Sequence, residues 1–340
     1  MELKQQIRSQ TKPNCSCCGS SGTYLYQGLQ DRLFAAQGIW NLKHCNNKQC
    51  ELLWLDPAPI SEDLPIAYQN YYTHGKNPLI KKSIYSSLKA GYRAIQYGYR
   101  VEETSFIERG LGSVLGFFNF FKEHMDFPFI YFKHQQKGRL LELGVGNGDA
   151  LKLFSYWGWQ AEGIDFDPVA VEHAVCQGLK VYEGDLFTQK FASDSFDAIF
   201  SSHVLEHVPD PEVLIKESLR VLKPGGIFVA VTPNASSKLH HFFKSNWRGL
   251  EPPRHLNIFT PKALLMALKN GGFKKIDVAS SNCSAIHNFN ESLLLSQGDG
   301  SKLKNSSFNK FCAFFACWYL NLMHRFSPLS GEELVLIAYK

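Results

Sequence analysis

The sequence predicts an α/β fold built on a doubly wound sheet, and residues 139–157 carry most of that prediction. An apolar run at 140–143 stops at the glycines Gly144, Gly146 and Gly148, and a helix-compatible segment follows at 149–157. A buried strand, a tight loop and a helix N-terminus form the opening unit of such a sheet. Because glycine lacks Cβ, the backbone of this loop can turn sharply and approach a ligand.

The glycine spacing and one carboxylate narrow the choice of ligand for this loop. The dinucleotide pattern G-x-G-x-x-G would need its third glycine at Asp149, whereas this sequence has it at Gly148. Glu142 lies just ahead of the loop, where its charge would repel a pyrophosphate but would suit ammonium and sulfonium groups. These two features favour S-adenosylmethionine.

The α/β alternation continues after the loop and supplies two more candidate cofactor ligands. A second strand ends at Asp165, where a carboxylate can accept hydrogen bonds from both ribose hydroxyls. Asp185 follows the third strand and could bind the adenine amine, or could serve as a turn or cap residue. Strands are predicted at 161–164, 179–183, 196–200 and 227–232, a helix at 211–221 and a turn at 222–226.

Composition and charge bound the class of protein. The 340 residues, 44% hydrophobic and 20% charged, are typical of a globular core domain with additions. The net charge of +5 is scattered, with no basic block of the kind that marks a nucleic-acid tail. Residues 1–14 are polar, and no apolar run reaches the roughly 20 residues of a membrane-spanning helix. We therefore expect a cytoplasmic protein without a secretory signal, whose nine cysteines are reduced.

Cysteines near the start of the chain form two close pairs. Cys15 and Cys18 make a C-x2-C knuckle, and Cys45 and Cys50 make a C-x4-C pair. Four thiolates in this arrangement can close a tetrahedral structural zinc site, which would leave no open position for catalysis. Two further side chains compete as ligands, Cys17 and His44. Free thiols in a loop-rich segment are the alternative.

The region that follows is rich in aromatic residues and shows no sheet pattern. Helices are predicted at 80–100 and 113–124, and aromatic pairs include Tyr71-Tyr72 and Phe117-Phe118. The helices could cap the sheet and bury these rings, or form a lid whose aromatics line a substrate pocket. The predicted organisation is a cysteine-paired segment (1–59), a helical cap or linker (60–137) and a main domain (138–340).

Five motifs in order resemble one family. The motifs are 142–148, Asp165, Gly184-Asp185 with Phe196-Asp197, Glu206-His207 and 222–226, and the set is similar to a class I S-adenosylmethionine-dependent methyltransferase. This resemblance implies a seven-stranded Rossmann-like sheet of order 3-2-1-4-5-7-6 with strand 7 antiparallel, and places strand 6 at 273–279 and strand 7 at 333–339. The predicted cofactor-binding residues are Glu142, Gly144, Gly146, Gly148, Asp165, Asp185 and Ser202.

The insert at 233–260 lies where the family builds its acceptor pocket. Its His255 could be the general base for an acceptor hydroxyl, and Arg254 could hold an anionic group such as a diphosphate. Both could instead anchor the loop. His207 competes for the base role, as does His203, and Glu206-His207 could instead cap a helix or orient its loop.

The cysteine-paired N-terminus ahead of this domain is similar to bacterial methyltransferases of sugar and surface-glycan pathways. This similarity favours methyl transfer to a hydroxyl of a sugar, sugar nucleotide or lipid-linked glycan intermediate. The alternatives are C-methylation of a nucleotide-linked keto-sugar, a lipid or quinone acceptor, and a non-enzymatic cofactor-binding regulator. The apolar stretch at 311–323 predicts a buried helix, or surface attachment near a lipid-linked substrate. Residues 296–307 are predicted to be an exposed linker.

Overall fold

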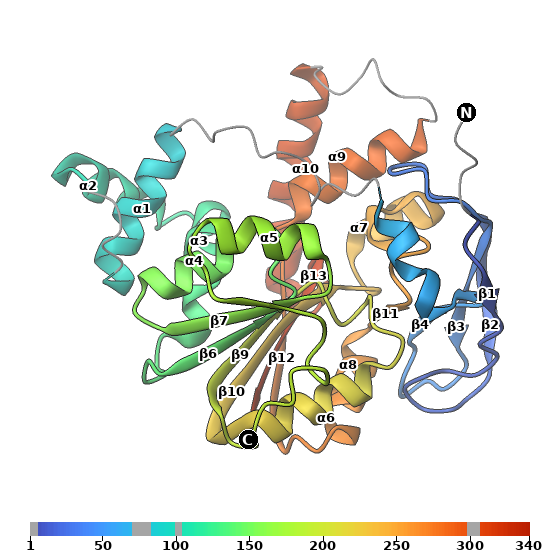
Figure 1. Cartoon of the computed structure of the whole chain (residues 1–340). Coiled ribbons are helices and arrows are strands. Elements are labelled where there is room, and N and C mark those ends of the chain that lie inside the picture. Colours follow the sequence, from blue (N-terminus) through green and yellow to red (C-terminus); the bar gives the residue numbers. More distant parts are fainter. Residues whose placement is uncertain (1–5, 70–82, 99–103, 298–306) are drawn as a thin grey trace. The chain divides into compact units, whose positions relative to one another are not determined.

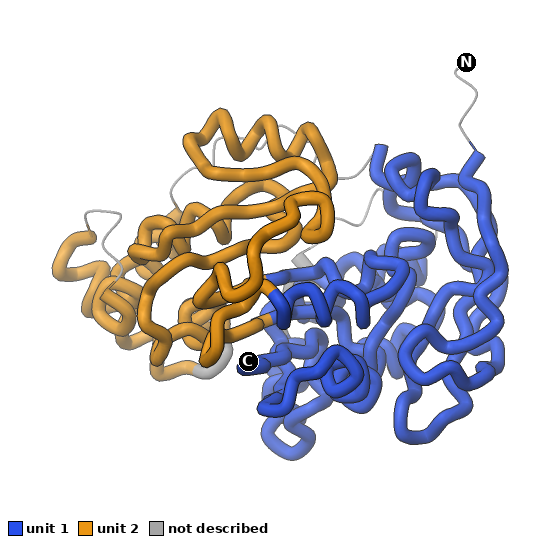
Figure 2. Tube along the Cα trace, turned by 60° about the horizontal axis from the view of Figure 1, so that its bottom comes forward, with its two compact units in different colours: residues 1–72, 201–220, 230–340 blue, residues 73–200, 221–229 orange. Residues whose placement is uncertain are grey.

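The computed structural model describes residues 6–69, 83–98, 104–297 and 307–340 (Figure 1). The chain divides into two compact units (Figure 2). Unit 1 comprises residues 1–72, 201–220 and 230–340, and unit 2 comprises residues 73–200 and 221–229. The cysteine-paired segment therefore shares a unit with the insert at 233–260. Of the predicted features, Tyr71-Tyr72, the ends of the helix at 80–100 and most of the linker at 296–307 lie outside the described residues.

A seven-stranded sheet has the order β12-β13-β10-β9-β6-β7-β8. Counted from β6 as the first strand, this order reads 3-2-1-4-5-7-6 from the β8 edge. The strands β6, β7 and β8 pair in parallel, and β12 and β13 pair antiparallel, so the predicted α/β class is confirmed. The strands are β6 (Arg139–Leu143), β7 (Gln160–Asp165), β8 (Val181–Glu183), β9 (Phe196–Ser202), β10 (Leu222–Pro233), β12 (Lys275–Ser281) and β13 (Glu333–Tyr339).

One predicted boundary in this sheet is wrong. The residues 222–226, predicted as a turn, form the first part of β10. Gly225 has a φ of 78°, which only glycine adopts without strain. The glycine therefore makes the strand locally irregular but does not end it.

Unit 2 carries helices on β6 to β8 and a helical region before them. α4 (Asp149–Tyr156) packs against β7, and α5 (Pro168–Cys176) packs against β7 and β8 (Figure 1). The predicted helix at 113–124 is two helices, because a Ser105–Glu108 capping box starts the first of them earlier. The elements before β6 are α1 (Ile84–Tyr97), α2 (Phe106–Leu115), α3 (Asn119–Asp126) and the short 3₁₀ helix η3 (Phe129–Phe132).

The aromatic residues of this region fall into two groups. Phe129 and Phe132 are buried, and their rings lie 4.5 Å from Trp157 and 5.2 Å from Phe154, centroid to centroid. Phe106 and Phe117, by contrast, are 90% and 85% exposed. The burying role predicted for the aromatics therefore holds for Phe129 and Phe132, and for Tyr92 in α1, which is 4% exposed, but not for Phe106 and Phe117.

Unit 1 contains a four-stranded sheet that joins two distant parts of the sequence. Its order is β11-β4-β3-β2, so a strand of the insert continues a sheet of the N-terminal segment. Asn257 pairs with Trp54 and Ile258 with Leu53. The strands are β2 (Gly22–Leu29), β3 (Trp40–Cys45), β4 (Leu53–Leu55) and β11 (Asn257–Ile258), with a separate pair β1 (Ser9–Gln10) and β5 (Ala58–Pro59).

The remaining helices of unit 1 lie around these strands and beside β12 and β13. One of them, α10, is amphipathic where a buried helix was predicted: Cys317 and Leu320 are buried, but Trp318 and Tyr319 are 58% and 52% exposed. Among the described helices, none combines the length and apolar character needed to cross a membrane. The helices are η1 (Ser61–Tyr68), α6 (Pro211–Val221), α7 (Lys238–Phe243), η4 (Lys244–Asn246), η5 (Arg248–Leu250), α8 (Pro261–Asn270), α9 (Ala285–Ser296) and α10 (Ser307–Phe326).

Candidate functional site

The glycine loop of unit 2 has the backbone that its sequence predicts. Gly144, Gly146 and Gly148 have φ values of 73°, 52° and 82°, which residues with a Cβ rarely adopt. The amide of Gly144 donates to the carbonyl of Ile164 at 2.9 Å, which ties the loop to β7. A Cβ added at Gly146 would meet no heavy atom within 4 Å. The loop backbone therefore faces open space at that position, directly before α4.

Glu142, at the end of β6, is buried without a full set of partners. Its side chain is 3% exposed, and its Oε2 atom has no hydrogen-bond partner among the described residues. Burial raises the pKa of Glu142 well above its ordinary value, and the nearby charges of Asp165 and Asp149 raise it further. A buried acceptor of this kind is stabilised by a cationic or hydrogen-bond-donating ligand.

Asp165 holds the loop and the end of β7 together. Its Oδ2 accepts a hydrogen bond from the amide of Gly146 at 2.8 Å, and its Oδ1 accepts one from the amide of Asp167 at 2.9 Å. Burial raises the pKa of Asp165, and these backbone donors partly oppose the shift. A carboxylate has about four acceptor sites, so Asp165 keeps capacity for a ligand hydroxyl.

The two other predicted cofactor ligands are Asp185 and Ser202. Asp185 is exposed, and its Oδ1 accepts hydrogen bonds from the amides of Phe187 and Thr188 at 2.9 and 2.7 Å, which are the contacts of a turn residue. Ser202 is half-buried and is the last residue of β9, in unit 1. Binding of the cofactor by either residue stays a prediction.

A second group of predicted residues lies together in unit 1, around a buried carboxylate. Glu206 is fully buried; its Oε1 lies 3.1 Å from Nδ1 of His203, and its Oε2 accepts a hydrogen bond from Thr232 Oγ1 at 2.9 Å. Nε2 of His203 lies 3.0 Å from Oε1 of Glu333. The side chain of His203 is 41% exposed; its partial desolvation alone would lower its pKa, but its bonds to the two carboxylates outweigh this and raise the pKa well above the ordinary value. His203 is therefore a cation near neutral pH and is poorly suited to act as a base.

His207 and His255 face one another in the same unit. Their ring centroids are 4.7 Å apart. Nδ1 of His207 lies 3.1 Å from the carbonyl oxygen of Arg254 and 2.9 Å from the hydroxyl of Tyr68. Nδ1 of His255 lies 2.7 Å from the carbonyl oxygen of Gly249. Burial lowers the pKa of both imidazoles, that of His255 to about 4, so both are neutral near pH 7.

Arg254 has several internal partners, and its contact with an acceptor anion stays a prediction. Its side chain is fully buried; Nε donates to Glu251 Oε1 at 2.8 Å, and Nη1 donates to Asp31 Oδ2 at 2.8 Å and to the carbonyl of Ala67 at 2.9 Å. These contacts favour the alternative interpretation, in which Arg254 anchors the insert. Asp31 lies 223 residues before Arg254 in the sequence, so no local pattern near Arg254 could predict this ion pair.

Four side chains of this cluster were not predicted from the sequence: Glu251, Asp31, Tyr68 and Glu333. Only Glu251 had a usable signal, since it lies three and four residues before Arg254 and His255. Its carbonyl accepts hydrogen bonds from both of their amides, at 2.9 and 3.1 Å, so one tight turn presents all three side chains.

A cavity of about 280 Å³ opens beside this turn, within unit 1. It is lined by residues of 27–33, by residues of 245–252 in the insert and by Leu295. Arg32 at its edge donates to the carbonyl of Leu295 and to Asn246 Oδ1, both at 2.7 Å. Glu251, which pairs with Arg248, lines the same cavity. Its size is near the lower end of ligand pockets, which span about 300–1,000 Å³.

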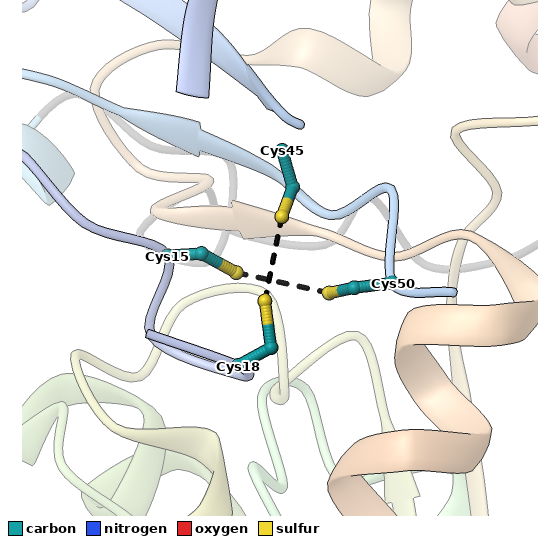
Figure 3. A group of neighbouring side chains, drawn as sticks. All are labelled: Cys15, Cys18, Cys45 and Cys50. Atoms are coloured by element: carbon teal, nitrogen blue, oxygen red, sulfur yellow. Dashed lines mark hydrogen bonds between the residues drawn. The ribbon is translucent and has the colours of Figure 1, made fainter. Parts of the chain in front are cut away.

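The four predicted thiols lie together in unit 1 (Figure 3). Sγ of Cys15 is 3.7 Å from Sγ of Cys50, and Sγ of Cys18 is 3.4 Å from Sγ of Cys45. Four sulfurs around one zinc ion at the usual bond length lie about 3.8 Å apart, so the cluster has the size of such a site. The two competing ligands are not part of it. Cys17 instead donates to the carbonyl of Ala263 at 3.5 Å.

Comparison with known proteins places the α/β region in a described family. Residues 123–278 match the family described as a methyltransferase domain. An uncharacterized protein of Methanocaldococcus jannaschii is 30% identical over 144 residues, which cover 42% of this chain and 68% of that protein. The sterol 24-C-methyltransferase of Aspergillus fumigatus is 27% identical over 183 residues, and 48% of each chain is covered.

The chain is also similar to two further proteins. The ubiquinone biosynthesis O-methyltransferase of Maricaulis maris is 26% identical over 147 residues, with 39% of this chain and 58% of that protein covered. A possible histamine N-methyltransferase from Thermotoga maritima, of known structure, is 18% identical with a TM-score of 0.43, covering 69% of this chain and 95% of that chain. The chain thus spans about half the length of the named curated methyltransferases that it matches.

Proposed function

Because the chain belongs to the class I S-adenosylmethionine-dependent methyltransferases, we propose that it transfers a methyl group from S-adenosylmethionine to a hydroxyl of a small acceptor. The acceptor class that we propose is a sugar, a sugar nucleotide or a glycan intermediate. Under this proposal, the glycine loop with Glu142 and Asp165 binds the cofactor, and His207 and His255 act on the acceptor.

One observation carries the cofactor assignment. Glu142 is a buried carboxylate with an oxygen that accepts no hydrogen bond from any described residue, at the start of a glycine loop with open space at Gly146. A nucleotide with only phosphate charges would meet repulsion there, whereas a ligand with ammonium and sulfonium charges would be attracted. Asp165, which already braces the loop, has lone pairs left for ribose hydroxyls.

The chemistry asks little of the protein beyond alignment and removal of a proton. When bound, S-adenosylmethionine supplies a methyl group on a sulfonium sulfur, which an acceptor oxygen displaces in line so that S-adenosylhomocysteine leaves. We assign removal of the hydroxyl proton to the neutral imidazole pair, His207 and His255. Of the two, His207 is the half-buried one, whereas His255 is 4% exposed and, with a pKa of about 4, a weak base.

Two classes of acceptor compete for the cavity in unit 1. Its lining combines charged groups, Arg32, Arg248 and Glu251, with the indole of Trp247, which suits a polar ring with an anionic substituent. The relatives that act on a sterol and in ubiquinone biosynthesis favour a lipid or quinone acceptor instead. Incubating the protein with labelled S-adenosylmethionine and parallel sets of sugar nucleotides and prenylated phenols decides between them. A labelled methyl group in the prenylated phenols alone would exclude the sugar proposal.

For the cysteine cluster we propose one structural zinc ion per chain, held by Cys15, Cys18, Cys45 and Cys50. The distances between sulfurs of the two sequence pairs, 3.7 Å from Cys15 to Cys50 and 3.4 Å from Cys18 to Cys45, support it. Metal analysis of protein purified without added zinc should give one ion per chain, and Cys45→Ser should lose it. Cys17→Ser is the matched control, since its sulfur bonds a carbonyl outside the cluster. Full metal content in Cys45→Ser would refute this ligand set.

Binding of the cofactor itself is tested by calorimetry. The wild-type protein should bind S-adenosylmethionine, and a chain that binds only a dinucleotide, or no nucleotide, would refute the proposal. A binding protein without transfer to any acceptor would leave the regulator alternative in its place.

A further inference from the structure

We propose that Glu206, His207 and His255 form a binding site for a divalent first-row transition-metal ion. One ligand atom from each of the three side chains lies within 4.8 Å of the others. Ligands at about 2.0–2.2 Å from one ion lie roughly 3–4 Å from each other, so small side-chain shifts would close the site. All three residues belong to unit 1.

The hydrogen bonds of the two imidazoles leave Nε2 of each ring as the atom that could bind a metal ion. Nδ1 of His207 lies 3.1 Å from the carbonyl of Arg254, and Nδ1 of His255 lies 2.7 Å from the carbonyl of Gly249. A carbonyl oxygen can only accept, so each Nδ1 carries the proton and each Nε2 keeps a lone pair. The Tyr68 hydroxyl, 2.9 Å from Nδ1 of His207, can also accept from this N–H. Metal-binding histidines almost always donate their second N–H in this way.

Nε2 of His255 also has no hydrogen bond to any of the described residues that metal binding would have to break. Its nearest carboxylate oxygen is Glu251 Oε2, at 3.6 Å, which is too long for a hydrogen bond. Glu251 is occupied by Arg248 and Arg254. The lone pair therefore remains available to an ion.

The carboxylate is oriented as firmly as the imidazoles. Oε1 of Glu206 bonds His203, and Oε2 accepts from Thr232 at 2.9 Å, so the group cannot rotate away. Carboxylates that bind metals are typically held by such outer hydrogen bonds. Glu206 and His255 are buried whereas His207 is half-buried, which gives an ion a side of entry.

Two imidazole nitrogens and one carboxylate oxygen favour manganese, iron, cobalt, nickel or zinc over magnesium or calcium. Three protein ligands leave coordination positions open for oxygen atoms of a second molecule. In a role that rests on the proposed function, the ion would bind the acceptor hydroxyl and lower its pKa. Both Nε2 atoms would then be occupied, so the ion would replace the imidazoles as the direct cause of deprotonation.

The test uses the full chain without S-adenosylmethionine. The protein is stripped with a chelator, given one equivalent of Zn²⁺ for the cysteine cluster, and titrated with Mn²⁺ or Co²⁺. We expect one further ion per chain, and pulsed electron paramagnetic resonance of bound Mn²⁺ should show nitrogen couplings from imidazole. His207→Ala and His255→Gln should weaken binding by at least about 10-fold. His241→Ala is the matched control, since that histidine is exposed and outside the cluster.

Absence of any ion beyond the cysteine site, absence of nitrogen couplings, or unchanged affinity in His207→Ala would each overturn the proposal. The nitrogen couplings are read from the wild-type protein, so they decide the matter even where a variant fails to fold. Calorimetry with S-adenosylmethionine on the chelated protein separates the two proposals. If the metal site alone is wrong, cofactor binding persists there, and if the methyltransferase proposal is wrong, cofactor binding fails while Mn²⁺ binding does not.

Discussion

The glycine loop of unit 2 and the histidine–glutamate cluster of unit 1 are assembled in opposite ways. The loop, with Glu142 and Asp165, comes from one βαβ unit, and its shape follows from backbone angles that only glycine adopts easily. The cluster draws on Asp31, Tyr68, 203–207, 251–255 and Glu333, and its shape follows from buried hydrogen bonds between distant segments. Local geometry therefore determines the first region, and tertiary packing determines the second.

If that contrast is right, substitutions in the cluster should have the larger effects, and His207→Ala the largest on turnover. Whether Nε2 of His207 takes a proton or holds an ion, its loss should lower kcat by about 10²- to 10⁴-fold. Affinity for S-adenosylmethionine should stay unchanged, because His207 is not one of the predicted cofactor ligands. Steady-state kinetics with the identified acceptor measures this, with His241→Ala as control. Near-normal turnover in His207→Ala would remove the cluster from the reaction.

The second effect should appear in stability. Arg254→Met would leave the carboxylates of Glu251 and Asp31 buried without their shared guanidinium. Breaking a buried ion pair from one side costs about 3–5 kcal/mol, so urea unfolding should show a loss of that order. Lys262→Met, at an exposed pair with Glu51, should change stability by about 1 kcal/mol or less. If the Arg254→Met protein is as stable as the wild type and only its KM for the acceptor is raised, the result supports the predicted contact between Arg254 and an acceptor anion.

The same contrast explains what the sequence could and could not predict. The strand, loop and helix at 139–156 and the acid at Asp165 were predicted because periodicity and glycine spacing are local signals. The pairing of β11 with β4 was not predicted, since it joins Ile258 to Leu53, which lie far apart in the sequence. The partners of Arg254 and His203 were missed for the same reason. The two cysteine pairs were an exception, because metal-ligand spacing is a local pattern within each pair.

A smaller effect is expected for Asp165→Ala in the loop. The substitution removes the acceptor of the Gly146 amide and the predicted ribose ligand together, so the dissociation constant for S-adenosylmethionine should rise about 10-fold or more. Asp185→Ala is the comparison, since its carboxylate bonds amides of its own turn. Calorimetry measures both. An equal loss in Asp185→Ala would support its predicted contact with adenine, and no loss in Asp165→Ala would contradict the cofactor assignment.

The smallest expected effect is a pH dependence of cofactor affinity that arises from Glu142 and not from the other residues of the loop. In the protein without ligand, burial raises the pKa of Glu142 well above 4.5, so its carboxyl group keeps a proton at pH values where the unfolded chain has lost it. A ligand with ammonium and sulfonium charges favours the ionised form. Binding should therefore release a proton, and affinity should rise with pH, by at most about 10-fold per pH unit, until the raised pKa is passed.

Folding stability of the unliganded protein should change in the opposite sense. Between the unfolded pKa and the raised folded pKa of Glu142, the native state binds more protons than the unfolded state. The contribution of Glu142 to stability is therefore present below the unfolded pKa and is lost as pH rises through the folded pKa. Glu142→Gln should abolish this slope and the slope of cofactor affinity together, while Asp185→Ala keeps both. If Glu142→Gln retains the pH dependence of cofactor binding, the ionisable group lies elsewhere in the loop, with Asp165 as the next group to substitute.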